Sequence, residues 1–393
     1  MTKPFYEQPI LNSPYFVPSH HHALTEDGRP QDFPPSEGRR KCGYVTPVPK
    51  ARKQRQGGGS QATLDLGAGT DAAGQAYGVA RIVDEIRQHL ASWRAIPNGA
   101  DWGVTPSTAR LLAHWRNPPE EAIRPFFCQV EAVETIIWLT EVARGRRQYA
   151  HIWKQLEAAN AEANPELFRL ALKMATGSGK TTVMAMLIAW HTVNAVRSPN
   201  SHFFSKGFLI VTPGITIRDR LRVLLPSDTE NYYATRQIVP QDMLPEMSKA
   251  KIVIANFHAF GHRRRLDTNR TGEAVLSGWR KEELITEETD GEMLQRACGD
   301  LLTMKNVVAI SDEAHHCYRA RASEDDEEKL TAEDKQEAKE NNEAARLWIS
   351  GIEALKQKVG LRGVYDLSAT PFFCVAQDMR KERFFPGWFR ILP

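Results

Sequence analysis

The sequence predicts an α/β fold: a parallel sheet with helices on both faces, preceded by a helical segment and a disordered N-terminal tail. Five apolar runs have the length of strands, helical patterns separate them, and polar residues follow each run directly. Continuous apolar strands that alternate with helices are typical of a parallel sheet covered on both sides. Residues that carry chemistry are expected at the carboxyl ends of such strands. The five runs are 170–174, 208–211, 252–255, 307–310 and 364–367.

The stretch 170–182, L-A-L-K-M-A-T-G-S-G-K-T-T, predicts a phosphate-binding loop between a strand and a helix. Backbone N–H groups of such a loop point inward, and the positive end of the following helix also attracts an anion. Gly177 and Gly179 permit positive φ angles and a close approach to phosphate oxygens. The Lys180 side chain can reach the β- and γ-phosphates, and the Thr181 hydroxyl can hold Mg²⁺. The predicted nucleotide-binding residues of the loop are Thr176, Gly177, Ser178, Gly179, Lys180, Thr181 and Thr182.

An ordinary glycine turn before a helix is the alternative for this stretch. Met174 stands where the strict pattern G-x-x-x-x-G-K-[ST] has its first glycine. The strand before the loop and the helix after it favour the phosphate-binding interpretation.

The stretch N-V-V-A-I-S-D-E-A-H at 306–315 predicts the second half of a nucleotide site. Asp312 at the end of a buried strand can hold the Mg²⁺ that bridges the β- and γ-phosphates, and Glu313 can deprotonate the attacking water. The alternatives are an acidic pair that caps a helix, and a metal site at His315, His316 and Cys317. Adjacent ligands on a helix cannot all face one ion, which disfavours the metal site.

Composition excludes several classes of protein. The chain has 393 residues, of which 41% are hydrophobic and 25% charged, as expected for a globular protein. Five scattered cysteines without a C-x-x-C pair fit a reducing cytosol and disfavour a zinc cage or a disulfide framework. The longest apolar run is too short to span a bilayer. We therefore expect a cytoplasmic protein with no membrane partner.

Three segments are predicted along the chain. Residues 1–76 form a Pro-rich basic tail, whose Arg39-Arg40-Lys41 cluster is interpreted as solvated, with nucleic-acid contact as the alternative. Residues 77–150 form helices, one of them opened by the N-cap Thr105 and another by Pro125. Gln129 in this segment has an amide that can donate to and accept from an adenine edge. Residues 151–393 form the α/β domain.

Four motifs, A-T-G-S-G-K-T, T-P-G-I-T-I-R-D-R, D-E-A-H and S-A-T-P, resemble in this order motifs I, Ia, II and III of superfamily 2 helicases. The closest resemblance is to the helicase/ATPase (Res) subunit of type III restriction enzymes and their DEAD/DEAH-box relatives. It runs from about Tyr77 to the C-terminus. The resemblance implies a first RecA-like domain at 151–393 that hydrolyses ATP with Mg²⁺ to drive movement on duplex DNA. It also implies a modification (methyltransferase) subunit as a possible partner.

The resemblance assigns roles to single residues. Gln129 matches the adenine-sensing glutamine. The catalytic residues would be Glu313, Lys180 and Asp312, and the metal would be held by Thr181 and Asp312. Residues that couple hydrolysis to movement would be His315, Ser368 and Thr370. Residues that contact the phosphate backbone of DNA would be Thr212, Arg218 and Asn256, and such contacts carry little sequence information.

The chain ends at Pro393, shortly after S-A-T-P. The resemblance implies a second RecA-like domain beyond this motif, with arginine residues that complete the ATP site. Arginine from a facing domain can be worth roughly 10³–10⁵ in turnover. We therefore expect ATP binding with weak or absent hydrolysis, and no strand separation by this chain alone.

Other classes of function remain open at this stage. One alternative is a catalytically incomplete, ATP-responsive module from a truncated gene that only binds nucleic acid. Another is a fragment of an RNA helicase, because the motifs do not separate RNA from DNA. A P-loop ATPase outside the helicases is disfavoured, since motif Ia and S-A-T have no role there.

Overall fold

The computed structural model describes residues 10–23, 31, 34–42, 68–163, 166–266, 285–314, 332–369 and 390–391. The chain divides into two compact units. The first unit is Met1–Val183 with Ser368–Pro393, and the second unit is Met184–Leu367. The predicted coupling residues His315 and Thr370 lie outside the described residues.

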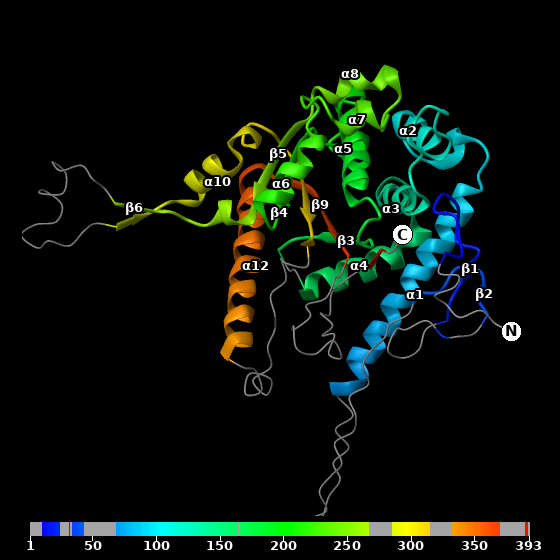
Figure 1. The fold of residues 1–393 in the computed structure, drawn as a ribbon, viewed down its shortest axis with the longest axis horizontal. Coiled ribbons are helices and arrows are strands. Elements are labelled where there is room, and N and C mark those ends of the chain that lie inside the picture. The colour runs from blue at the N-terminus through cyan, green and yellow to red at the C-terminus, as the bar shows by residue number, and fades with distance from the viewer. Residues whose placement is uncertain are drawn as a thin grey trace, which may run out of the picture. The chain divides into compact units, whose positions relative to one another are not determined.

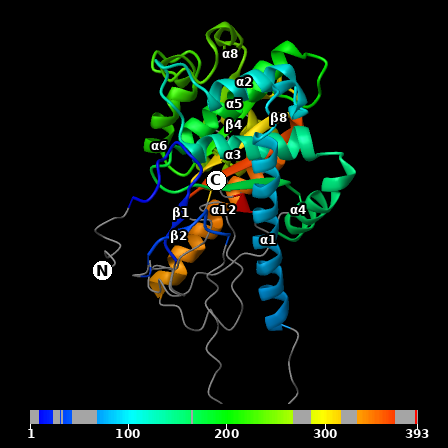
Figure 2. The same ribbon diagram turned by 90° about the vertical axis from the view of Figure 1, so that its right-hand side faces the viewer.

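The first unit holds the helical segment (Figure 2) and the first predicted strand. The long helix α1 contacts α3, and the Glu85 carboxylate of α1 lies 2.6 Å from Nε2 of His151 on α4. The helices are α1 (Ala68–Arg94), α2 (Pro106–Arg116), α3 (Phe127–Ile137) and α4 (Ala150–Ala163), with the short turns η2 (Gly99–Trp102), η3 (Trp138–Ala143) and η4 (Arg147–Tyr149). The strands are β1 (His20–His21), β2 (Ser36–Glu37), β3 (Arg169–Lys173) and β10 (Arg390–Ile391).

The start of α2 follows the sequence prediction. Thr105 has extended backbone angles, its hydroxyl accepts a hydrogen bond from the Thr108 N–H at 3.1 Å, and Pro106 is the first helical residue. Helix α3 begins two residues after Pro125, at Phe127. Its N-cap residue, Phe126, has no polar side chain, so other groups must satisfy the first N–H groups of this helix.

The N-terminal region differs from the prediction in its described parts. Helix α1 begins at Ala68, earlier than the predicted start near Tyr77. Residues 10–23 and 34–42, which the prediction placed in a disordered tail, have defined contacts. Strands β1 and β2 pair in antiparallel fashion, and the Asn12 side chain accepts from the backbone N–H groups of Ser19 and His20. Composition missed these contacts because they depend on partners far away in the sequence.

Four of the described strands of the second unit are hydrogen-bonded in the order β9-β8-β4-β5, and each neighbouring pair is parallel. Strand β3 of the first unit pairs in parallel with β10. The strands of the second unit are β4 (Gly207–Thr212), β5 (Lys251–Asn256), β6 (Arg264–Leu266), β7 (Ile285–Glu287), β8 (Val307–Asp312) and β9 (Leu361–Ser368). All five predicted apolar runs are thus strands, and the predicted parallel α/β fold is confirmed.

Helices flank these strands. The α-helices are α5 (Lys180–Arg197), which begins in the first unit, α6 (Ile215–Arg220), α7 (Tyr232–Thr235), α8 (Leu244–Met247), α10 (Asp290–Cys298) and α12 (Ala332–Val359). The 3₁₀ turns are η5 (Leu221–Leu224), η6 (Gln241–Met243), η7 (Phe257–Phe260) and η8 (Gly299–Leu301). Residues 184–194 of α5 are all at most 1% exposed. A helix that is buried on every side forms part of the core, which explains its continuous apolar sequence.

The antiparallel pair β6–β7 projects away from the other strands of the second unit (Figure 1). Its base is held by Arg296 of α10, which donates to the Glu288 carboxylate and to the carbonyls of Ala259 and Gly261. Hydrogen bonding from Arg296 lowers the pKa of Glu288 to about 2. The carboxylate therefore stays charged at any physiological pH and keeps the base of the ribbon in place.

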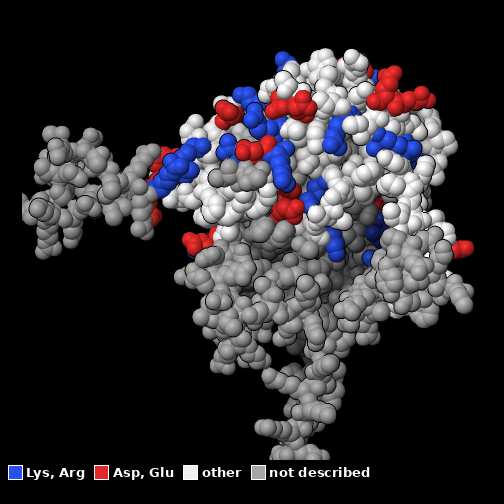
Figure 3. Space-filling model, viewed as in Figure 1, with Lys and Arg blue, Asp and Glu red and all other residues white. Residues whose placement is uncertain are grey.

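Charged side chains of both signs are scattered over the described part of the surface in view (Figure 3). On the face in Figure 3, Lys and Arg side chains are interspersed with Asp and Glu side chains among the described residues. A polyanion would therefore be bound on this face by particular loops rather than by a broad field of one sign. Within the described ranges, no helix combines the length and the apolar character that a membrane span requires.

We predict that Gly351→Ala destabilises the protein although alanine is the better helix former. A Cβ at position 351 of α12 would overlap the ring of Phe260, which is 2% exposed, and would force η7 and α12 apart. Overpacking costs about 1–3 kcal/mol, whereas alanine gains about 1 kcal/mol over glycine in a helix. The midpoint of urea denaturation should fall.

The matched control is Gly291→Ala in α10, where nothing lies within 4 Å of the Cβ position. This change should leave the midpoint unchanged or raise it. Equal effects of the two substitutions would contradict the packing argument.

Candidate active site

The predicted phosphate loop has the backbone that anion binding requires. Gly177 and Gly179 have φ angles of 80° and 83°, which side-chain-bearing residues rarely adopt. The Ser178 N–H donates to the Ala175 carbonyl at 3.1 Å, which closes the turn, and α5 begins directly afterwards at Lys180. The loop therefore leads into the positive end of an 18-residue helix, the arrangement that attracts phosphate.

Gln129 lies against this loop, although 49 residues separate it from Ser178. Its Nε2 donates to the Ser178 carbonyl at 2.8 Å, and its Oε1 accepts from the Phe126 N–H at 3.0 Å. The side chain is only 5% exposed. Gln129 thus closes the first turn of α3 and ties that turn to the phosphate loop.

Two further features of the loop depend on this contact. A Cβ at Gly179 would overlap the Gln129 amide, so glycine is required there for space as well as for its φ angle. The neighbouring Cys128 thiol lies 4.0 Å from the same Ser178 carbonyl, and burial raises its pKa, which keeps the S–H donor protonated. Sequence reasoning missed Cys128, because a lone cysteine has no motif.

Ser368, a predicted coupling residue, accepts a backbone hydrogen bond from Met174, the residue before the loop. The Met174 N–H donates to the Ser368 carbonyl at 2.9 Å, and Ser368 is 3% exposed. The strand that leads into the phosphate loop is therefore tied directly to the start of S-A-T-P. A backbone movement at either residue would therefore strain or break this hydrogen bond and so affect the other residue.

In the second unit, the strands end side by side at one edge of the sheet. Thr212 is paired with Asn256, and Asp312 with Leu367, while Val211 is paired with Ser311. The ends of β5, β4, β8 and β9 are therefore in register. Polar residues therefore lie at this edge, with the buried Asp312 at the end of the central strand β8, whereas their chemical roles stay predictions.

Glu313, the residue after β8, has a φ of 47°. The left-handed region costs a side-chain-bearing residue roughly 1–2 kcal/mol and persists only where the surroundings impose it. Such strain gathers at functional positions. The Glu313 side chain is half-buried at this position.

The predicted nucleic-acid residues have different surroundings. Thr212 is fully buried, and its hydroxyl donates to the Gly214 carbonyl at 3.1 Å. The Asn256 side chain donates to the Pro213 carbonyl at 3.2 Å and accepts from the His258 N–H. Both side chains therefore shape the T-P-G loop. Arg218 on α6 is exposed, so its guanidinium can reach a ligand in solvent.

The donor chemistry fits Mg²⁺. Each of the two predicted metal ligands, Thr181 in the first unit and Asp312 in the second, carries an oxygen donor, the type of ligand that this ion takes. Magnesium is usually bound by one or two carboxylates together with substrate phosphates and waters. In the part of the chain that the structure describes, no three His, Cys, Asp or Glu side chains form a metal cage.

Comparison with known families identifies the chain. The family described as type III restriction enzyme, res subunit, matches residues 122–372, which is more than half of the 393 residues. The chain belongs to this family. It is a Res-subunit relative whose helicase-like, ATP-binding motor domain has the RecA-like fold. No curated protein matches the chain.

The Res-subunit match begins within the segment that the sequence predicted to be a separate helical region. It therefore includes Gln129 as well as the phosphate loop, Asp312, Glu313 and Ser368. Family membership makes the chain an ATPase of helicase type and implies an interaction with DNA. The roles of the single residues remain predictions.

We predict that Glu313→Gly is more stable than Glu313→Ala by about 1 kcal/mol. Both variants lose the carboxylate, but only glycine adopts a φ of 47° without strain. Denaturant midpoints of the two purified variants measure the difference. At Glu353, inside helix α12, the same pair should show the opposite order, because glycine is the poorer helix former by about 1 kcal/mol. If the alanine variant were the more stable one at both positions, the left-handed backbone of Glu313 would not be strained.

Proposed function

We propose that this chain binds ATP with Mg²⁺ and hydrolyses it, and that in the full-length system hydrolysis drives movement on duplex DNA. The observation that carries the proposal is the Gln129 amide, held 2.8 Å from the Ser178 carbonyl of the phosphate loop. A base-recognising group and a phosphate-binding loop are thereby fixed to each other in one unit.

The geometry of Gln129 suits adenine. A primary amide has two N–H donors and a carbonyl with two lone pairs, and the contacts described above use one of each. The remaining donor and lone pair match N7 and the N6 amino group of adenine, the pairing that glutamine makes with this base. Guanine presents O6 where adenine has its amino group, so the amide carbonyl would face another acceptor. ATP should therefore bind more tightly than GTP.

The hydrolytic roles follow from charge and position. Lys180 and the N–H groups of the loop would bind the β- and γ-phosphates, with Thr176, Gly177, Ser178 and Thr182 completing the loop. Thr181 and Asp312 would hold Mg²⁺, which supplies charge neutralisation at the phosphates when it is bound. Glu313 would orient the attacking water and take its proton.

The coupling and nucleic-acid roles are also proposals. The bond between Met174 and Ser368 offers a route by which a change at the phosphate loop moves the S-A-T-P segment. Arg218 would contact DNA phosphates directly. Thr212 and Asn256 would act by holding the T-P-G loop, since their side chains bond to its carbonyls.

A modification (methyltransferase) subunit is the partner we propose, because the family is named after a restriction-enzyme subunit. Access to both ATP and DNA favours a cytoplasmic location. The scattered cysteines agree with this compartment.

We predict that Glu313→Gln lowers ATP turnover by about 10²–10⁴-fold while ATP binding is retained. The amide keeps the shape of the side chain but cannot accept the proton of the attacking water. Phosphate release and equilibrium binding of a fluorescent ATP analogue, each with and without duplex DNA, measure the two effects. Unchanged ATP turnover in Glu313→Gln would show that Glu313 is not the general base.

We also predict that Lys180→Ala weakens ATP binding by about 10–100-fold, because charge-assisted hydrogen bonds to the phosphates are lost. The same binding assay measures this loss. If Lys180→Ala bound ATP as tightly as the wild type, the interpretation of residues 170–182 as a phosphate-binding loop would be contradicted. Competition binding with matched DNA and RNA duplexes shows which nucleic acid the chain prefers. A preference for RNA would favour the RNA-helicase alternative.

A further inference from the structure

The described N-terminal residues contact the beginning of α3 at three points. The Phe127 N–H donates to the Pro14 carbonyl at 2.8 Å. The rings of Tyr15 and Phe126 pack with centroids 5.6 Å apart. Arg39 reaches Glu131. These contacts surround the turn that carries Gln129.

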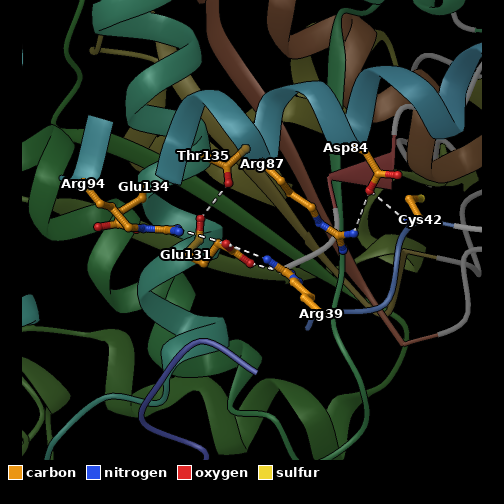
Figure 4. A network of polar contacts seen from close by, with 8 residues as sticks. All are labelled: Arg39, Cys42, Asp84, Arg87, Arg94, Glu131, Glu134 and Thr135. Carbon is orange, nitrogen blue, oxygen red and sulfur yellow. Dashed lines mark hydrogen bonds and ion pairs between the residues drawn. The ribbon is translucent and has the colours of Figure 1, made fainter. Parts of the chain in front are cut away.

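The contact of Arg39 with Glu131 is a bidentate ion pair (Figure 4). Nη1 and Nη2 of Arg39 donate to the two carboxylate oxygens at 2.8 and 2.6 Å. The Glu131 side chain is 1% exposed and that of Arg39 is 20% exposed. A planar guanidinium that binds both oxygens fixes the orientation of the carboxylate as well as its position.

The pair belongs to a larger network of polar contacts around α3 (Figure 4). Arg94 of α1 donates to Glu131 at 3.0 Å and also to Glu134, which accepts from Arg116 as well. Burial opposes the charge of Arg94, but the two carboxylates raise its pKa above the ordinary value. Three arginines thus face two buried glutamates, and the loss of Arg39 would leave two of each.

The start of α3 depends on these contacts because Phe126 cannot cap the helix with its side chain. The first N–H groups are satisfied by the Pro14 carbonyl and by the neighbouring Gln129 side chain. The guanidinium groups of Arg39 and Arg94 both lie over the Phe127 ring, with their Cζ atoms 5.9 and 5.1 Å from its centroid. The turn from Phe126 to Glu131 is therefore held from outside the helix.

We propose that Arg39 is a positioning residue for base recognition: by clamping Glu131, two residues after Gln129, it fixes the amide that selects adenine. The inference rests on the proposed function, because it assumes that Gln129 contacts the base. It gives the N-terminal segment a part in nucleotide selection. The Arg39-Arg40-Lys41 cluster then acts in part through a buried carboxylate, rather than as a solvated tail.

The loss of Arg39 should affect base selection and leave phosphate binding intact. A loosened turn lets the Gln129 amide rotate away from the orientation that favours adenine over guanine. The phosphate loop keeps its own glycine turn and Lys180. Arg39→Ala should therefore lower ATP affinity by roughly tenfold, the scale of one amide–base pair, with GTP affinity nearly unchanged.

The test measures equilibrium dissociation constants of ATP and GTP for the full 393-residue chain by calorimetry. The variants are Arg39→Ala, Arg39→Lys, Gln129→Ala and Lys180→Ala. The control is Arg197→Ala, which removes another arginine–glutamate pair, with Glu246 at 2.7 Å in the second unit. Circular dichroism verifies folding, and Arg39→Lys, which keeps the charge without the fork, covers the case in which the alanine variant does not fold.

The inference is supported if the ATP preference falls in Arg39→Ala and in Gln129→Ala, is partly retained in Arg39→Lys, and is unchanged in Arg197→Ala. It is overturned if Gln129→Ala abolishes the preference while the Arg39 variants keep it, because the ion pair is then only structural. It is also overturned if ATP and GTP affinities fall equally in the Arg39 variants. Absence of ATP binding in the wild type, or unchanged binding in Lys180→Ala, would contradict the proposed function itself.

Discussion

The hydrogen bond between the Gln129 amide and the Ser178 carbonyl is the contact on which the organisation of the site depends. One side chain completes the first turn of α3, fills the space that only glycine leaves at position 179, and fixes a helix to the phosphate loop. The same amide retains a donor and a lone pair for a nucleotide base. The start of the helix and the shape of the loop therefore both depend on one residue.

Buried charge imposes a cost that the network around α3 must offset. Isolated carboxylates as deeply buried as Glu131 and Glu134 would be strongly destabilised. Here each accepts hydrogen bonds from two arginines, which come from the N-terminal segment, α1 and α2. A purely apolar contact would hold these elements together without fixing their register. Directional ion pairs between fixed partners favour one arrangement of the turn that carries Gln129.

The carboxyl edge of the second unit combines rigid and strained backbone. Buried strands in register place Asp312 among three strand ends, and Thr212 and Asn256 use their side chains to hold the T-P-G loop. Glu313, directly after β8, takes a left-handed conformation. A rigid edge can impose this strain because its strands have no freedom to relax it.

The sequence by itself determined the five strands, the glycine-rich loop, the strand end at Asp312 and Glu313, and the family, because continuous apolar runs and glycine positions act locally. It also indicated Gln129, but only by residue type and distance along the chain. Only the tertiary structure decided that this amide meets Ser178, that Met174 bonds to Ser368, and that Arg39 pairs with a buried glutamate. Long-range contacts of this kind depend on the packing of elements far apart in sequence, and composition carries no record of them. The sequence alone predicts that the basic cluster Arg39-Arg40-Lys41 is solvated, because only the tertiary structure shows the Glu131 carboxylate that pairs with Arg39.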